Sequence, residues 1–173
     1  MPDLLVVPPD PRWPAAFAAE AHRLAPLVPD LHHIGSTAVP GLAAKPTIDV
    51  LGCLPDLDGI DVFGLAAAGY ELRGFSGLPG RVFLRRMEGG RRLAHLHLYA
   101  VGDPRADRHL VFRDWLRARP DRAVAYGALK LALAARPGQT RAGYIAAKDP
   151  WVRAEEARAL AWAAQASHRL RRR

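Results

Sequence analysis

The stretch from His33 to Gly52 constrains the fold most, because it runs from a glycine-serine turn through a loop into an apolar strand. Gly35 has no β-carbon to block close approach of a ligand, and Ser36 offers a hydroxyl and an amide where a helix can begin. Exposed amides of this kind bind anions. Asp49 stands in a β-rich run, where a lone carboxylate needs a compensating partner. The stretch therefore predicts a phosphate-binding turn beside a possible metal ligand.

Composition indicates one globular domain. The chain has 173 residues, of which 50% are hydrophobic, and this is enough to bury a substantial core. A single cysteine, Cys53, excludes an intrachain disulfide and gives no zinc-finger spacing. The sequence shows neither a signal peptide at its start nor an uncharged apolar run long enough to cross a bilayer. We therefore expect a soluble cytoplasmic protein that does not associate with membranes.

The charge balance favours anionic partners. Lys and Arg number 25 against 17 Asp and Glu, which gives a net charge of +8. Nucleotides, phosphorylated small molecules and nucleic acid all fit this balance. The case for nucleic acid is weak, because several of the charges lie in the arginine-rich end at residues 169–173, where a solvated terminus explains them equally well. The sequence leaves the oligomeric state open.

Hydrophobic periodicity and turn residues predict an α+β protein, with strands in the first part of the chain and helices after it. The sheet-bearing part covers residues 1–103 and the helical part residues 104–173 of a single domain. Strands are expected at 31–34, 47–53, 70–75, 82–87 and 93–101. Helices are expected at 15–27, 59–69, 110–118, 121–136 and 142–171, the last one broken near Asp149 and Pro150.

The block from His33 to Asp49 resembles the hallmark block of the GrpB family, a branch of the DNA polymerase beta-like nucleotidyltransferase superfamily. The resemblance continues through Gly80 to Phe83, His95 to His97, Leu110 to Arg117 and Tyr126 to Lys130, so it covers nearly the whole chain. It implies a nucleotidyltransferase-like mixed sheet with flanking helices and a C-terminal helical half. It also implies a nucleotide or other phosphorylated ligand, a divalent metal ion such as Mg²⁺, Mn²⁺ or Zn²⁺, and transfer of a nucleotidyl group.

The acidic pattern departs from that superfamily at one position. Its members carry two acids one residue apart on a strand, because side chains two apart share a face and hold metal ions together. Here Asp49 is the first acid, but Leu51 occupies the second position. The missing acid opens an alternative from another functional class, a non-catalytic ligand-binding or accessory module.

His95 and His97 alternate along a strand and therefore point to one face. The resemblance implies that this strand neighbours the Asp49 strand, in which case Asp49, His95 and His97 form a set suited to Mn²⁺, Fe²⁺ or Zn²⁺. Two histidines hydrogen-bonded beside a cleft without metal are the competing interpretation. If a reaction takes place, Asp49 and His97 are the predicted catalytic residues.

Further ligand contacts are predicted on both sides of that strand. Lys45 precedes it, and Arg81 opens another strand after Gly80, where a guanidinium can bind phosphate through two hydrogen bonds. Tyr126 and Lys130 lie four residues apart on one helical face. Each has a plain alternative as a surface or core residue. The predicted phosphate-binding residues are Gly35, Ser36, Lys45, Arg81, Tyr126 and Lys130.

Other enzyme classes lack their motifs in this sequence. No Walker A loop, dinucleotide-binding glycine motif or nucleophile elbow occurs. Some members of the GrpB family are fused to dephospho-CoA kinase, but without a P-loop this chain is not expected to carry that activity.

Overall fold

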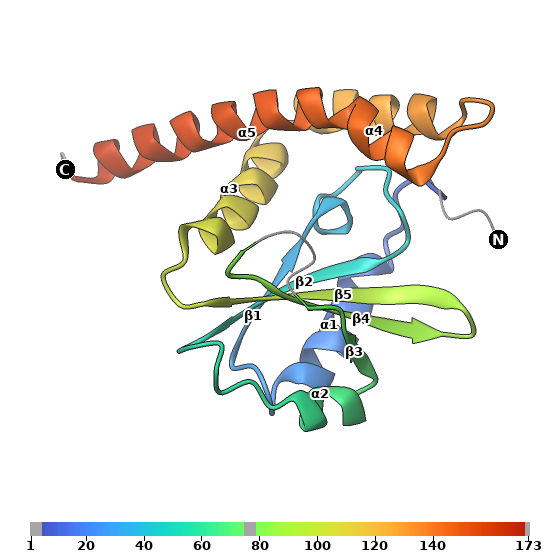
Figure 1. Ribbon diagram of the computed structural model, residues 1–173. Helices are drawn as coiled ribbons and strands as arrows, with labels where there is room; N and C mark the ends of the chain where they lie inside the picture. Colours follow the sequence, from blue (N-terminus) through green and yellow to red (C-terminus); the bar gives the residue numbers. More distant parts are fainter. Residues whose placement is uncertain (1–4, 75–78, 172–173) are drawn as a thin grey trace.

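The computed structural model describes residues 5–74 and 79–171, with side chains described up to residue 165. A five-stranded mixed sheet crosses the middle of the molecule, and helices cover both of its faces (Figure 1). Helices α1 and α2 lie on one side of the sheet, and α3, α4 and α5 lie on the other. This is the α+β, nucleotidyltransferase-like fold that the sequence predicted, with its helical half at the C-terminal end.

The sheet brings together strands that are far apart in sequence. Its order is β1-β2-β5-β4-β3, in which β2 and β5 are parallel and the other neighbours antiparallel. The strands are β1 Asp30–Ile34, β2 Ile48–Leu54, β3 Tyr70–Leu72, β4 Val82–Glu88 and β5 Arg91–Ala100. Gly89 and Gly90 turn β4 into β5 with positive φ angles, which glycine adopts without strain.

The two faces of the central strands differ because side chains alternate along a strand. Val50 of β2 and Leu96 of β5, both fully buried, join the main apolar core under helices α1 (Trp13–Leu24) and α2 (Val62–Ala67). On the opposite face, Leu51 is also fully buried and packs in a smaller cluster with Tyr99. Asp49, His95 and His97 lie on that second face, which the C-terminal helices cover.

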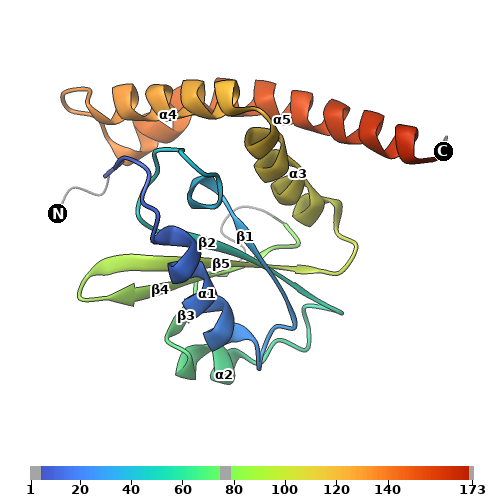
Figure 2. The ribbon, with the colours of Figure 1, turned by 180° about the vertical axis from the view of Figure 1, so that it is seen from behind.

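The helical half lies above the sheet in Figure 2, and its helices share an apolar cluster with Val39 and Leu42 of the segment before β2. Its helices are α3 Pro104–Ala118, α4 Pro120–Ala134 and α5 Arg141–Arg171. The carboxylate of Glu155 on α5 is fully buried, where it accepts hydrogen bonds from Trp115 on α3 (3.0 Å) and Arg122 on α4 (3.1 Å). A buried charge requires such partners, and here they tie the three helices together.

Several expected boundaries were wrong. Helix α5 continues through Pro150 instead of breaking there, because Trp151 stacks on Tyr126 of α4 and Glu155 is anchored one turn later. Helix α3 begins at Pro104, earlier than expected, because Asp103 caps it through the amide of Arg105 (2.8 Å) and proline suits a first turn.

Helix α2 spans only Val62–Ala67, and β3 ends at Leu72, while Phe75 lies outside the described residues. Asp61 caps α2 through the amide of Gly64 (2.8 Å), which explains why the helix starts later than expected. Among the described helices, none is both long and apolar enough to span a bilayer.

Candidate functional site

The glycine-serine turn follows the last pair of the β1–β2 ladder, Ile34 with Asp49. Gly35 has a φ of 70°, and a β-carbon there would collide with the carboxylate of Asp49. Both facts require glycine at this position. Ser36 then begins a short 3₁₀ turn, Ser36–Ala38. The chain therefore passes directly over Asp49 before it presents Ser36.

Side chains from the helical half hold this turn in place. Arg113 of α3 donates to the carbonyl of His33 (3.1 Å), and Arg117 donates to the carbonyl of Ala38 (2.9 Å). Lys130 of α4 donates from Nζ to Ser36 Oγ (2.8 Å). The turn is thus fixed on both sides of Ser36 by residues that follow it by many positions in the sequence.

His33 supports the turn from inside. Its ring stacks on Phe17 at 4.7 Å, and its Nε2 lies 2.9 Å from Thr37 Oγ1. Burial lowers the pKa of His33 to about 4, so the ring is neutral at pH 7. The structure thus places His33 as a neutral hydrogen-bond partner of the turn.

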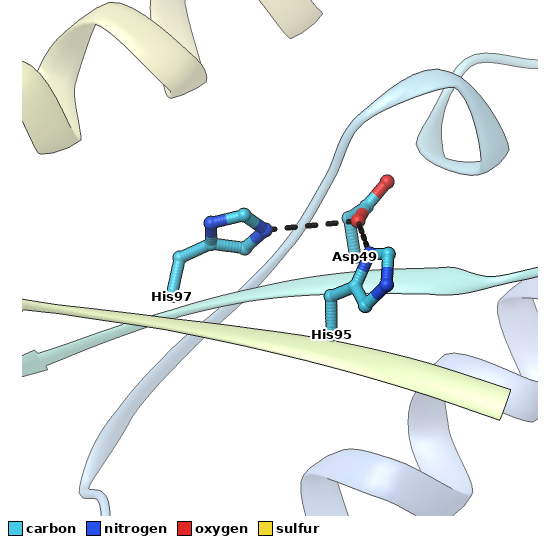
Figure 3. Close-up of side chains that lie close together, drawn as sticks. All are labelled: Asp49, His95 and His97. Carbon is cyan, nitrogen blue, oxygen red and sulfur yellow. Dashed lines mark hydrogen bonds and ion pairs between the residues drawn. The ribbon is translucent and has the colours of Figure 1, made fainter. Parts of the chain in front are cut away.

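Asp49 of β2 and the two histidines of β5 converge on one side of the sheet (Figure 3). Asp49 pairs with His95 in the parallel register, and Leu51 pairs with His97. His95 Nδ1 lies 2.9 Å from Asp49 Oδ1, and His97 Nε2 lies 3.6 Å from the same oxygen. The sequence expectation that these strands are neighbours is confirmed.

The spacing of these three groups suits a metal ion. One possible ligand atom from each residue lies within 4.8 Å of the others. Ligands about 2.1 Å from a metal are separated by about 3.0 to 3.4 Å in octahedral or tetrahedral geometry. The observed separations of 2.9 and 3.6 Å bracket that range closely. One carboxylate with two imidazoles therefore fits Mn²⁺, Fe²⁺ or Zn²⁺ better than Mg²⁺, which prefers oxygen ligands.

Asp49 is ionised in this setting. Burial alone would raise the pKa of its carboxyl, but hydrogen bonds from His95 and His97 and their positive charge when protonated outweigh burial and lower it. Its side chain is 29% exposed and therefore remains reachable. The carboxylate is thus a permanent negative charge at the junction of the sheet and the helical half.

A cavity of about 220 Å³ opens on the His95 side of Asp49. We call it the basic hollow, because five of its lining residues are cationic and Asp49 is its one acid. Ser36, Thr47, Tyr126 and Tyr144 add hydroxyl groups. The cationic residues are Lys45, Arg92, Lys130, Arg141 and Lys148.

Lys130 lies at the inner wall of the basic hollow and is only 3% exposed. Burial, with a smaller contribution from the charge of Lys148, lowers its pKa to about 7. Its ammonium also lies 4.4 Å from the centre of the Tyr126 ring, which in turn stacks on Trp151. This aromatic support orients a lysine that carries its proton only marginally at neutral pH.

A second cavity, of about 250 Å³, opens on the His97 side of Asp49. We call it the mixed hollow, because apolar groups and charges of both signs line it. Its lining residues are Ile34, Gly35, Ser36, Asp49, His97, His109, Phe112, Arg113, Leu116, Tyr126, Lys148, Val152 and Glu156. Ser36, Asp49, Tyr126 and Lys148 belong to both hollows, so the two meet along one wall.

Most of the residues predicted as site residues lie along these two hollows. Gly35, Ser36, Lys45, Tyr126 and Lys130 line one or both. Arg81 is placed differently. Its Nη1 lies 3.5 Å from Nδ1 of His97 and its guanidinium stacks on Phe83, and it is not among the lining residues of either hollow. Its assignment as a phosphate ligand stays a prediction.

Sequence reasoning missed several lining residues. His109 of α3 lies 5.7 Å from His97 between ring centres, and its Nε2 lies 3.3 Å from the hydroxyl of Tyr99. Burial lowers its pKa to about 4. Arg92 and Arg141 line the basic hollow. Position on a helix or strand gave no signal for these residues, because their meeting depends on how the helical half sits on the sheet.

Comparisons with a family model, with related sequences and with a solved structure all indicate the same family. Residues 3–158 match the family model described as GrpB protein. The UPF0157 protein YqkA of Bacillus subtilis is 38% identical over 157 residues, which cover 87% of this chain and 46% of YqkA. A UPF0157 protein of Pseudomonas aeruginosa is 43% identical over an alignment that covers 90% of this chain and 67% of that protein. The crystal structure of conserved protein GrpB from Enterococcus faecalis has a TM-score of 0.84 and 36% identity, covering 90% of this chain and 97% of that one.

A further relative carries an enzyme name. A dephospho-CoA kinase of Mycolicibacterium paratuberculosis is 32% identical over 91% of this chain, but the chain spans only 46% of that protein. The chain likewise spans less than half of YqkA. The matched portion here contains no P-loop sequence, so the comparison with the kinase extends to the shared portion and not to its activity.

Proposed function

The chain belongs to the GrpB family, and from this premise we propose that it binds a nucleotide or similar phosphorylated ligand together with a divalent metal ion. The phosphates occupy the basic hollow beside Gly35 and Ser36. Asp49, His95 and His97 hold the metal. The observation that carries the proposal is that Asp49 and His95 line one cavity with Ser36 and three lysines, while His97 lies close to Asp49 in the adjoining hollow.

Charge complementarity supports a ligand with several negative charges. Five cations face one acid in the basic hollow. Bringing that many positive charges together without an anion is unfavourable, and the lowered pKa of Lys130 reflects this in part. A bound phosphate chain would compensate these charges through charge-assisted hydrogen bonds.

The residues around the basic hollow have different roles in this proposal. Ser36 and Lys130, already joined by a 2.8 Å hydrogen bond, bind phosphate oxygens at the inner end. Lys45 lies 5.2 Å from the ring centre of Tyr144 and binds at the outer end. Arg113 and Arg117 keep the turn rigid through its carbonyls. When bound, the metal ion supplies charge neutralisation of the phosphates.

Transfer of a nucleotidyl group is the reaction that this set of residues supports best. Asp49, which both hollows share, and His97, which lines the mixed hollow, would act on the reacting phosphate. The buried Leu51 favours the alternative, a module that binds the same ligand without catalysing its transfer. Release of pyrophosphate from a nucleoside triphosphate distinguishes the two.

Thermal-shift measurement with nucleoside triphosphates, with and without Mn²⁺, tests the binding proposal. A ligand present at 100 times its Kd stabilises the native state by about 2.7 kcal/mol, which corresponds to a rise in Tm of about 5 °C or more for a chain of this size. We expect the rise with triphosphate and Mn²⁺ together, and a smaller one with either alone.

Matched variants locate the site. Asp49→Asn should remove the Mn²⁺-dependent part of the rise, whereas Asp58→Asn, an exposed acid beyond β2, should keep it. Lys130→Met should reduce the triphosphate-dependent part, whereas Arg153→Met on the exposed side of α5 should not. An unchanged Tm for the wild type with every triphosphate and metal would refute the proposal.

A further inference from the structure

The two hollows share Asp49 and differ in their other lining residues, and therefore in the ligand that each can take. Both border on the carboxylate of Asp49, one beside His95 and the other beside His97. Their volumes are similar, about 220 and 250 Å³. A site with one ligand would need only one of them. The presence of two cavities that meet at a possible metal ligand suggests two molecules that meet there.

The charges of Arg113 and Glu156 in the mixed hollow are compensated by protein groups. Arg113 donates to both carboxylate oxygens of Asp114, at 2.8 and 3.0 Å, and to the carbonyl of His33. Glu156 accepts from Arg108 at 3.0 and 3.1 Å. The other charged lining residues are Lys148 and Asp49, so cations and acids balance in this lining, whereas cations outnumber acids in the lining of the basic hollow.

The remaining walls of the mixed hollow are largely apolar. Ile34 and Leu116 are each 2% exposed, and Phe112 and Val152 lie partly buried beside them. Apolar walls with a few polar groups are typical of sites for small, uncharged molecules. The lining has no excess of cations to bind a phosphate backbone, so a nucleic-acid strand is a poor fit.

We propose that the mixed hollow binds the acceptor of the transfer reaction, an uncharged small alcohol with an apolar body. The proposal rests on the proposed function, because the basic hollow must hold the phosphorylated donor. The acceptor oxygen forms a bond to the α-phosphorus of the nucleoside triphosphate. The bond from that phosphorus to the bridging oxygen breaks, pyrophosphate leaves, and the acceptor proton passes to water.

Paramagnetic relaxation tests the assignment. Mn²⁺ bound at Asp49 broadens the NMR signals of any small molecule held within several ångströms. The probes are a panel of small aliphatic and aromatic alcohols that includes 4-methylbenzyl alcohol, with 4-methylbenzoate as the anion of the same skeleton. We expect alcohols to be broadened by the Mn²⁺-loaded protein, the broadening to persist with saturating inorganic tripolyphosphate, and the carboxylate to bind at least about tenfold more weakly.

Two variants on α5 make the site assignment sharper. Val152→Trp should fill the mixed hollow and abolish broadening, whereas Leu160→Trp, at a position 49% exposed on the same helix, should keep it. Glu156→Lys adds a cation at the cavity wall and should reverse the preference from alcohol to carboxylate. Glu156→Lys keeps the test decisive if Val152→Trp does not fold.

The outcomes separate this inference from the proposed function. Normal binding of Mn²⁺ and tripolyphosphate without broadening of any alcohol would overturn the acceptor assignment alone. Displacement of the alcohol by tripolyphosphate, or equal binding of alcohol and carboxylate, would overturn it too. Failure of the wild type to bind Mn²⁺ and tripolyphosphate would overturn the proposed function and this inference together.

Discussion

The two faces of strands β2 and β5 are built from alternate residues of the same segments, yet they serve opposite purposes. Toward α1 and α2, Val50 and Leu96 are fully buried in a continuous apolar core. Toward α3, the neighbouring residues Asp49, His95 and His97 remain partly exposed, with side chains 29%, 20% and 12% accessible. One face stabilises the fold, and the other keeps polar groups within reach of solvent and ligand.

The face that carries Asp49, His95 and His97 depends on the apolar face opposite it. A carboxylate and two imidazoles stay in a fixed array only if their strands cannot slip, and a shift by one residue would exchange the two faces. The apolar residues between them fix that register. Conversely, the polar groups of Asp49, His95 and His97 add little to stability, so changes at these three residues should act on binding and changes in the opposite core should act on folding.

Leu51→Asp should have the largest effect on stability, because Leu51 is a buried apolar residue on the same face of β2 as Asp49. It is fully buried against Tyr99 and Ile34, so an aspartate there would place a charge in an apolar cluster. We expect a loss of at least about 4 kcal/mol in the free energy of unfolding. Denaturant titration followed by circular dichroism measures it.

Leu131→Asp is the matched control for this change, since Leu131 is 41% exposed on α4 and should tolerate the charge. If Leu51→Asp instead kept its stability and bound Mg²⁺ more tightly than the wild type, the second acidic position would still be usable. The contrast between a buried Leu51 and an accessible Asp49 would then be wrong.

Leu96→Ala should destabilise the protein by about 3 kcal/mol, because it leaves a cavity in the main apolar core under α1 and α2. Binding of Mn²⁺ and triphosphate by the folded fraction should not change. The adjacent His97→Ala should do the reverse, costing about 1 kcal/mol in stability while weakening Mn²⁺ binding. Denaturation curves and titration calorimetry on the same two samples compare the faces directly. Loss of Mn²⁺ affinity in folded Leu96→Ala would mean that the faces are not separable.

Lys130 should give the smallest but most specific effect, a pH dependence of ligand binding. Its pKa of about 7 means that the free protein loses this positive charge as the pH rises above 7. A bound anion raises that pKa, so triphosphate binding at pH 8 should take up close to one proton, and affinity should fall by up to about tenfold per pH unit until the lysine of the complex deprotonates.

Calorimetry in buffers of different ionisation enthalpy measures this uptake. Lys130→Met should take up none and should bind triphosphate with a flatter pH profile. A wild-type binding enthalpy that is the same in every buffer at pH 8 would show that Lys130 does not change its protonation on binding.

Much of the fold could be predicted because its signals are local. A β-rich run marked the strand around Asp49, alternation of apolar and polar residues marked the strand around His95, and the Gly89-Gly90 pair marked the turn between β4 and β5. Pro150 misled because the cost of a proline inside a helix is offset by tertiary packing of Trp151 and Glu155, which no local pattern reveals.

The site could be predicted only in part. Asp49, His95 and His97 share a face by strand periodicity, and the family resemblance supplied the neighbouring strands. The partners from α3 to α5 could not be placed, because the hydrogen bond from Lys130 to Ser36 joins residues 94 positions apart, and the position of His109 beside His97 depends on helix packing over the sheet.

Calorimetric titration of Mn²⁺ tests whether Asp49, His95 and His97 form a metal site on the polar face of the sheet. We predict binding to the wild type that is lost in Asp49→Asn and weakened by at least about tenfold in His97→Ala. His22→Ala, an exposed histidine on α1, should bind as the wild type does. Equal Mn²⁺ binding by all four folded proteins would contradict the account and leave the two histidines as structural partners of Asp49.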